Sequence, residues 1–331
     1  MLLKNTYPEK VLICGLGSIG KKYLRLISEK WPLIKIGILT SQNKISLKDS
    51  YKISFISNNL NESLKWRPNA VFICNPASFH IEYALFFLKM NIPVLIEKPL
   101  GTGREKIKDL KILEKLSKNC VALVGYVLRH EEEFKYLNNF LKNNQFGNII
   151  YGSFKSSSWL PEWRKNCIYT QSVSVNKNLG GGALLELSHE IDLAQSFLGE
   201  INLIEAKLEN SGKLDIEVED KVYLFGKTET CDQIIINLDF CSKDTQRISY
   251  LKSKKGTIKW DLFNKFIEIK IVNQEIKRIN FNKNPNIKFI NQIEHFFYCI
   301  NKVAKPSCKI KDGIMVLDLV NRARRLSNDY L

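Results

Sequence analysis

The chain has 331 residues, of which 44% are hydrophobic and 25% are charged. These ordinary values exclude a disordered, collagenous or coiled-coil protein, and the length predicts two domains. The formal net charge of +16 comes from 50 lysine and arginine residues against 34 acidic residues. The basic residues are scattered and no basic arm accompanies them, so we expect neither nucleic acid nor a membrane as a partner. A positive field still attracts an anionic small molecule.

The eight cysteines are spread along the chain, and no two of them form a CxxC pair. This excludes zinc-ribbon and thioredoxin-type interpretations, and we expect no metal site. No secretory signal is evident after Met1, which favours a cytoplasmic location with reduced thiols. The longest apolar stretch, residues 83–96, contains Lys89 and Pro93 and is too short to span a bilayer.

The first 125 residues alternate short apolar runs with segments of helical spacing. Buried strands are predicted at residues 10–14, 35–39, 70–74, 94–96 and 120–124. Helices are predicted at residues 18–29, 78–90 and 105–117. The first helix places Ile19, Tyr23, Leu26 and Ile27 on one side. This alternation is typical of an α/β domain with a parallel sheet covered on both faces.

Residues 126–331 have a different rhythm. Strands separated by polar or glycine turns are predicted at residues 149–156, 201–208, 220–225, 233–240, 247–252, 257–261 and 266–271. Helices are predicted at residues 132–142, 183–198, 287–303 and 312–327. The pattern predicts an α+β domain with a mostly antiparallel sheet. The C-terminal helix is a candidate for packing back on the first domain.

A glycine-rich turn, GLGSIG, follows the first predicted strand and opens the first predicted helix. The first glycine permits a tight turn, the second lets the backbone approach a pyrophosphate, and the third lets the helix pack close to the strand. The helix N-terminus then faces the phosphates. The predicted dinucleotide site therefore includes Gly15, Gly17, Ser18, Ile19 and Gly20. The alternative is an ordinary turn with coincidental glycines.

The second predicted strand ends without the acidic residue that often binds the ribose 2′-hydroxyl of NAD. The sequence there is Thr40-Ser41-Gln42-Asn43-Lys44. Ser41 and Lys44 suit a 2′-phosphate, which favours NADP and adds both residues, with Thr40, to the predicted cofactor site. The alternative is that a backbone group or Asn43 binds the ribose of NAD.

Further motifs follow the glycine turn in a fixed order. They are CNPASFH at residues 74–80, EKP at 97–99, GGGALLELSHEID at 180–192 and GTIKWD at 256–261. This ordered set resembles the Gfo/Idh/MocA oxidoreductases over nearly the whole chain. The resemblance implies a Rossmann domain over residues 1–125 and an open-sheet domain for substrate binding and oligomerisation over residues 126–331. It also implies NAD(P)-dependent oxidation or reduction at a carbinol carbon of a sugar, cyclitol or nucleotide sugar.

A narrower resemblance concerns the substrate. The pair Trp163-Arg164 and the stretch LSHEID at residues 187–192 look like a branch of the family associated with bacterial surface-sugar metabolism. This implies a sugar or nucleotide-sugar substrate in surface-carbohydrate biosynthesis. A non-catalytic regulator that senses a dinucleotide or a sugar on the same fold is the alternative function.

The resemblance implies two catalytic residues. In such proteins the lysine of the EKP motif, here Lys98, sits beside the nicotinamide and the reacting hydroxyl, where its charge suits a developing alkoxide. Pro99 biases Lys98 towards an extended backbone. A histidine on the helix after the glycines, here His189, acts as acid or base, since imidazole titrates near neutral pH. Both residues argue against a sensor.

On a continuous helix, His189 shares a face with Glu186 and Asp192, which lie three residues before and after it. A carboxylate then orients the imidazole. The alternative is a core histidine satisfied by a backbone carbonyl. Family members often have an aspartate four residues before the histidine. The different spacing here leaves open which group accepts the proton and whether Glu186 touches the substrate.

Other side chains complete the predicted site. An arginine suits a carboxylate or phosphate, and aromatic rings suit a sugar face. The predicted substrate contacts are Arg129, Trp163, Arg164, Tyr169, Glu186 and Asp192. The remaining predicted cofactor contacts are Asn75, Pro76, His80, Glu97 and Lys98. The glycines before His189 leave room for a ligand and expose helix N–H groups, or else form a plain turn.

The resemblance also implies a homodimer or homotetramer. Assembly is expected through the sheet of the second domain, especially residues 201–240.

Overall fold

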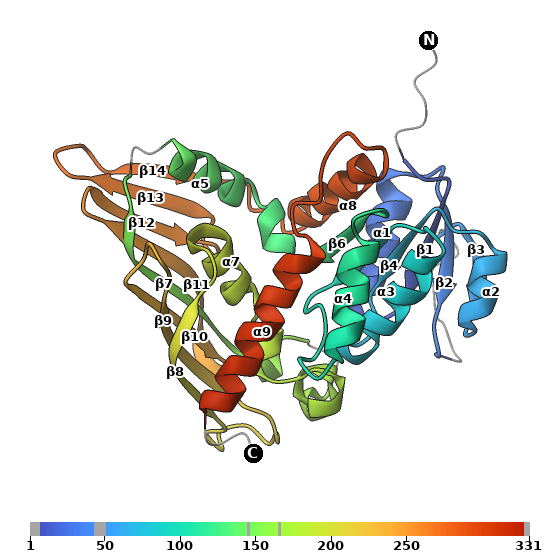
Figure 1. Ribbon diagram of the computed structural model, residues 1–331, viewed down its shortest axis with the longest axis horizontal. Coiled ribbons are helices and arrows are strands. Elements are labelled where there is room, and N and C mark those ends of the chain that lie inside the picture. Colours follow the sequence, from blue (N-terminus) through green and yellow to red (C-terminus); the bar gives the residue numbers. More distant parts are fainter. Residues whose placement is uncertain (1–6, 43–50, 144–145, 165–166, 328–331) are drawn as a thin grey trace, which may run out of the picture. The chain divides into compact units, whose positions relative to one another are not determined.

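The computed structural model describes residues 7–42, 51–143, 146–164 and 167–327. The chain divides into two compact units (Figure 1). The first unit contains residues 1–127 and 289–314, and the second contains residues 128–288 and 315–331. The chain therefore returns to the first unit after it has built most of the second.

A six-stranded parallel sheet forms the centre of the first unit, with the order β3-β2-β1-β4-β5-β6. Its strands are β1 (Lys10–Cys14), β2 (Lys35–Leu39), β3 (Ile53–Ser57), β4 (Ala70–Ile73), β5 (Val94–Glu97) and β6 (Ala122–Gly125). The central strands are buried apolar runs, as expected for a sheet covered on both faces. The strand order reverses between β1 and β4, and sheets of this type bind ligands at that point.

Helices cover both faces of this sheet (Figure 1). They are α1 (Ser18–Lys30), α2 (Leu60–Lys65), α3 (His80–Lys89), α4 (Ile107–Leu116) and α8 (Ile287–Ile300). Helices α1 and α8 share one core, where the Phe72 ring of β4 lies 5.0 Å from the Tyr23 ring and 5.4 Å from the Phe296 ring. The segment after α8 also belongs to this unit, because the Val124 N–H donates a hydrogen bond to the Cys308 carbonyl.

The second unit contains an eight-stranded open sheet with the order β14-β13-β12-β11-β7-β10-β9-β8. Its strands are β7 (Ile149–Trp159), β8 (Asn202–Glu209), β9 (Lys221–Lys227), β10 (Gln233–Asp239), β11 (Cys241–Ser253), β12 (Gly256–Asp261), β13 (Phe266–Ile271) and β14 (Lys277–Asn280). Only the pair β7–β10 is parallel. The predicted α/β domain followed by an α+β domain with a mostly antiparallel sheet is confirmed.

The helices of the second unit are α5 (Glu132–Lys142), α6 (Ala183–Glu186), α7 (His189–Leu198) and α9 (Ile310–Leu326), the last beginning in the first unit. Short 3₁₀ turns occur at Ala77–Phe79, Val127–His130, Leu160–Glu162, Tyr169–Gln171, Val173–Val175 and Lys177–Leu179. Helices α7 and α9 lie on one side of the open sheet (Figure 1). Alternate residues of β9 and β10 are buried, and those between them are half-buried.

The prediction of one continuous helix over residues 183–198 is wrong. Leu187 has φ −97° and ψ +22°, outside the helical region, so α6 ends at Glu186 and α7 begins at His189. Strands β3 and β14 and helix α2 were not predicted. All three are short, and β3 and β14 are edge strands, so no long apolar run marks them.

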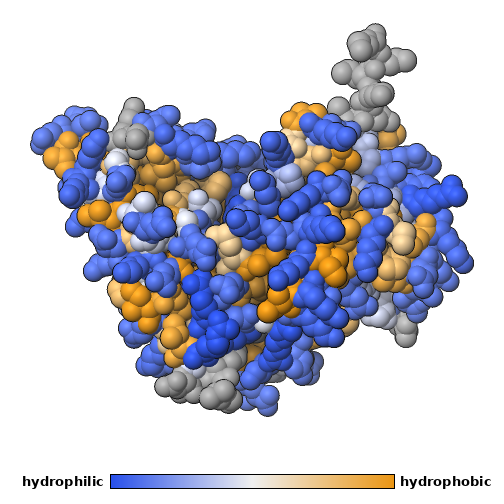
Figure 2. Space-filling view, in the orientation of Figure 1, coloured by the Kyte–Doolittle hydropathy of each residue, from blue (hydrophilic) through white to orange (hydrophobic). Residues whose placement is uncertain are grey.

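Hydrophilic side chains cover most of the surface seen in Figure 2. Among the helices of the described residues, none is both long enough and apolar enough to cross a membrane.

Candidate functional site

The turn between β1 and α1 needs each of its three glycines for a different reason. Gly15 has φ +93°, and a Cβ there would lie 2.7 Å from the Asn75 nitrogen. A Cβ on Gly20 would collide with the Gly15 carbonyl oxygen. Gly17 is different, because a Cβ there would meet nothing within 4 Å. The first and third glycines therefore serve close packing, and the second faces open space.

This open space suits the phosphates of a dinucleotide. Gly17 and Ser18 are exposed and Ile19 is half-buried, and within the described chain no side chain caps the N-terminus of α1. The first N–H groups of the helix are thus left to a ligand, and an N-terminus favours an anion. At the end of β2, Thr40 is half-buried and Ser41 is exposed. Lys44, also predicted here, lies outside the described residues, as does Asn43.

The loops after β4 and β5 are tied together by His80. Its ring nitrogens Nδ1 and Nε2 each lie 2.8 Å from a carbonyl oxygen, of Pro99 and of Asn75 respectively. The ring is only 1% exposed, and this burial lowers the pKa of His80. Asn75 Oδ1 is buried and has no partner in the described residues, which leaves an acceptor for a ligand. Pro76, half-buried, follows directly.

Glu97 and Lys98 stand at the end of β5. The Tyr23 hydroxyl donates a hydrogen bond to Glu97 Oε1 over 2.6 Å, and the Lys98 N–H donates to Oε2 over 3.2 Å. Burial raises the pKa of Glu97 to about 6, although Tyr23 and Lys98 lower it in part. Because β4 lies between β1 and β5, the glycine turn, Asn75 and Lys98 gather at one edge of the sheet. These residues fit a bound dinucleotide.

His189 begins α7 in the second unit, and two acidic residues that follow it in the same turn, Glu190 and Asp192, form ion pairs. Arg129 contacts Asp192 through Nε and Nη2, with its Nε 2.9 Å from Oδ2. Arg247 Nε lies 2.8 Å from Glu190 Oε1. The Arg129 and Asp192 side chains are 9% and 1% exposed, and His189 is buried. The structure thus pairs two predicted substrate contacts with each other.

Glu186 does not share a helix with His189. It is the last residue of α6 and is half-buried. The expectation that Glu186, His189 and Asp192 form one stripe by helical spacing is therefore wrong for Glu186. His189 and Asp192 both lie in the first turn of α7 and keep that relation.

The glycines before α6 pack against Glu219. Gly182 has φ +107°, and a Cβ there would collide with the Glu219 carboxylate. Glu219 Oε1 accepts a hydrogen bond from the Leu184 N–H over 3.1 Å, and its carbonyl accepts from the Ala183 N–H. An acidic side chain of this protein thus occupies the helix N-terminus. Close packing therefore accounts for Gly182, and Glu219 already binds the N–H groups of Ala183 and Leu184.

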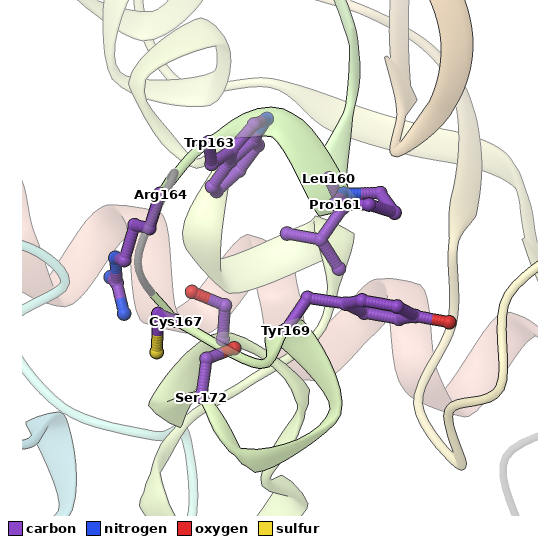
Figure 3. A pocket seen from close by; sticks show the side chains of 8 residues that line it. Leu160, Pro161, Trp163, Arg164, Cys167, Tyr169 and Ser172 are labelled. Carbon is purple, nitrogen blue, oxygen red and sulfur yellow. The ribbon is translucent and has the colours of Figure 1, made fainter.

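Three predicted substrate contacts line one pocket of the second unit (Figure 3). Trp163 donates from Nε1 to Ser158 Oγ over 2.8 Å, and the Tyr169 hydroxyl accepts from the Asp215 N–H. Arg164 is exposed. The other lining residues are Leu160, Pro161, Cys167, Ser172 and Ser174. In the described part of the chain, no group of three or more His, Cys, Asp or Glu side chains is placed to hold a metal ion.

Sequence patterns do not identify Tyr23, Gln292 and Glu219 as polar residues of these sites. Gln292 belongs here because its Oε1 lies 2.7 Å from the Tyr23 hydroxyl oxygen. Tyr23 was assigned to the apolar side of its helix, and it does lie in the core. Gln292 interrupts an apolar helix face formed by Phe289, Ile293 and Phe296, which is the signal that marks a buried polar group.

The order of the parallel sheet, the glycine turn at its reversal point and the second α+β unit define a two-domain, dinucleotide-binding oxidoreductase fold. Residues 9–126 match a family model described as an oxidoreductase family with an NAD-binding Rossmann fold. Residues 134–256 match the GFO/IDH/MocA C-terminal domain. The chain belongs to the Gfo/Idh/MocA family.

Individual relatives are distant. Inositol 2-dehydrogenase of Corynebacterium glutamicum is 26% identical over 161 residues, which cover 45% of this chain and 48% of that protein. The chain thus spans about half the length of the curated relatives it matches. A levoglucosan dehydrogenase in complex with NADH and levoglucosan shares the fold with a TM-score of 0.81 and 16% identity, covering 96% of this chain and 98% of that one. The WlbA dehydrogenase of Bordetella pertussis, in complex with NADH and UDP-GlcNAcA, has a TM-score of 0.77 and 16% identity, covering 97% and 96%.

Alanine substitutions at Gly17 and Gly20 should separate binding from folding. Gly17→Ala meets no atom within 4 Å, so its free energy of unfolding should stay within about 1 kcal/mol of the wild type. Its affinity for NADH and NADPH should fall at least about tenfold, because the methyl group keeps the backbone from a pyrophosphate. In Gly20→Ala the new methyl group collides with the backbone, so this variant should lose about 3 kcal/mol or more of its free energy of unfolding. Urea unfolding and nucleotide fluorescence measure both; wild-type nucleotide affinity in Gly17→Ala would contradict the site.

Glu97→Gln should remove a pH dependence of stability. The carboxyl pKa rises from 4.5 to about 6 on folding, so the folded state holds the proton more tightly. The wild type should therefore lose about 2 kcal/mol of unfolding free energy relative to Glu97→Gln as the pH rises from 4 to 7. Urea unfolding across this range measures the difference. Glu82→Gln, on the exposed side of α3, is the control; a pH-independent difference for Glu97→Gln would refute the assignment.

Proposed function

We propose that the protein is an NAD(P)-dependent dehydrogenase or reductase that acts on the CH–OH group of a sugar or nucleotide sugar. The observation that carries the proposal is the position of Lys98. It follows β5, at the same sheet edge as the glycine turn, and its neighbour Glu97 is held in place by Tyr23. The names of two similar proteins, an inositol dehydrogenase and a levoglucosan dehydrogenase, describe the same class of reaction.

In the proposed reaction the chain's own residues handle charge and a proton. A bound nicotinamide supplies the hydride chemistry. In the oxidative direction, the ammonium of Lys98 stabilises the substrate oxygen as negative charge develops on it. His189 takes the hydroxyl proton, and the carbinol carbon becomes a carbonyl carbon. The reverse direction uses the same groups, with His189 returning the proton.

We propose a nucleotide sugar of bacterial surface-carbohydrate biosynthesis as the substrate class. Its support is the Trp163-Arg164 pair, the LSHEID stretch and the UDP-GlcNAcA bound to the WlbA dehydrogenase, together with the net charge of +16. Trp163, Arg164 and Tyr169 line one pocket (Figure 3), and these residue types suit a phosphate and a sugar face. Arg129, Glu186 and Asp192 remain proposed contacts. For the cofactor we propose NADP, supported by Ser41 and Lys44 and by the absence of an acidic residue from positions 40–48 of the sequence.

Lys98→Met should abolish turnover and leave nucleotide binding nearly intact. The substitution keeps the length of the side chain but removes its charge, so we expect a loss of roughly a thousandfold in kcat/KM. Cofactor oxidation and reduction with a panel of sugars and nucleotide sugars measures it, alongside nucleotide fluorescence. Lys111→Met, on exposed helix α4, is the control. Wild-type turnover in Lys98→Met would refute the role. Dinucleotide binding without any turnover in the wild type would favour the regulator.

We propose that two or four copies assemble through the open sheet. Its support is the half-buried face of β9 and β10, where Tyr223, Phe225 and Ile235 are neighbours. Light scattering after size exclusion should give a dimer or tetramer. Phe225→Lys should yield monomers, because a charge then faces an apolar surface. Phe263→Lys, in an exposed turn outside this face, is the control and should leave the assembly unchanged. A monomeric wild type would contradict the proposal.

A further inference from the structure

Two buried polar side chains lead to the Glu97 carboxylate inside the first unit: Tyr23 contacts it, and Gln292 contacts Tyr23. Tyr23, on α1, and Gln292, on α8, are both fully buried. The Tyr23 hydroxyl oxygen lies 2.6 Å from Glu97 Oε1 and 2.7 Å from Gln292 Oε1. A chain of three polar groups therefore runs from α8 through α1 to the residue before Lys98.

A count of protons shows that the hydrogen bonds among Glu97, Tyr23 and Gln292 can be arranged in two ways. A hydroxyl carries one proton, so Tyr23 can donate to only one of its two neighbours at a time. When Glu97 is protonated, it donates to Tyr23, and Tyr23 donates to Gln292 Oε1. When Glu97 is ionised, Tyr23 donates to Glu97, and a turned Gln292 amide donates from Nε2 to Tyr23. As placed, Nε2 is buried without a partner in the described residues, so turning the amide gives it one.

The groups that face Glu97 from the surrounding elements decide between these forms. Lys22 of α1 and Lys98 after β5 attract the ionised carboxylate, and the Tyr23 hydroxyl donates to it. The buried Cys74 thiol faces it from the end of β4. Strand β6 contributes Gly125, where a Cβ would lie only 3.0 Å from Oε1, so the carboxylate fills the space of a missing side chain. Burial opposes ionisation and raises the pKa of Glu97 to about 6.

We propose that Tyr23 and Gln292 are positioning residues, which keep the Glu97 carboxylate ionised and fixed beside Lys98 at neutral pH. Glu97 accepts a hydrogen bond from the Lys98 N–H, so the place of this carboxylate sets the backbone from which the Lys98 side chain projects. The consequence for catalysis rests on the proposed function. The hydrogen-bond chain itself does not depend on any substrate.

The test uses two variants that keep the core filled. Tyr23→Phe retains the ring that packs against Phe72 and removes only the hydroxyl. Gln292→Met has a similar length and removes the amide. With glutamate labelled at its carboxyl carbon, ¹³C NMR follows the titration of Glu97 in the ligand-free protein, and Glu97→Gln assigns its signal. Tyr298→Phe, on α8 but 45% exposed, is the control.

We expect the pKa of Glu97 to rise by about one pH unit in Tyr23→Phe, because a hydrogen bond to the charged form is lost. Gln292→Met should give a smaller rise in the same direction, because the bond that Gln292 donates to Tyr23 strengthens a hydrogen bond to a charged group, whereas the bond that Gln292 accepts joins neutral groups. Tyr298→Phe should give no rise. In the reductive direction the proton of His189 sets the basic limb of the pH profile. The acid limb of kcat/KM in that direction should therefore move upward by the same amount as the NMR titration in each variant. A purely structural role would lower stability in both variants and leave both titrations where they are.

An unchanged Glu97 titration in both variants would overturn the hydrogen-bond chain. A shifted titration with an unmoved acid limb would overturn the positioning role. If Tyr23→Phe does not fold, the Glu97 titration in Gln292→Met alone tests the hydrogen-bond chain. If the wild type turns over no substrate, the proposed function fails, and the NMR titration alone judges the inference.

Discussion

The close approach of α1 to the turn after β1 is the constraint on which the first unit depends. Only a residue without a side chain fits at Gly20, because the Gly15 carbonyl oxygen occupies the space of a Cβ. This contact fixes the depth of the whole helix. One turn before it, the N-terminus of α1 is held at the sheet edge beside Gly17. Three residues after it, Tyr23 lies deep enough to reach Glu97.

In the second unit, ion pairs rather than a close backbone contact hold the functional helix, α7, in place. The first turn of α7 carries Glu190 and Asp192, and each carboxylate is matched by an arginine from another element. Acidic residues suit a helix N-terminus, and buried charges need partners. Arg129 comes from the turn at Val127–His130 and Arg247 from β11, so both pairs tie His189 to fixed parts of the unit. The two ion pairs thus hold the helix turn that carries His189, the proposed base.

The sequence allowed the central strands, the glycine turn and the order of the two domains to be predicted, because each leaves a local pattern of apolar runs or glycines. The break at Leu187 leaves none, since neither a glycine nor a proline lies among residues 183–198. The partners Tyr23 and Gln292 are 269 positions apart, and nothing local to either announces the other. Glu219 likewise reaches α6 from 35 residues away. Contacts of this kind are set by the fold, and pattern alone does not reveal them.

The return of residues 289–314 to the first unit affects how the protein folds while it is being synthesised on the ribosome. Phe296 completes the core beside Phe72, and the Cys308 carbonyl accepts the β6 bond from Val124. Both arrive after the whole open sheet has been synthesised. During translation the nascent N-terminal sheet therefore waits with one face incompletely covered, and its exposed apolar surface is the kind that chaperones recognise. The first unit is completed only at residue 314, after the open sheet has been synthesised, and the segment from residue 315 onward then completes the second unit.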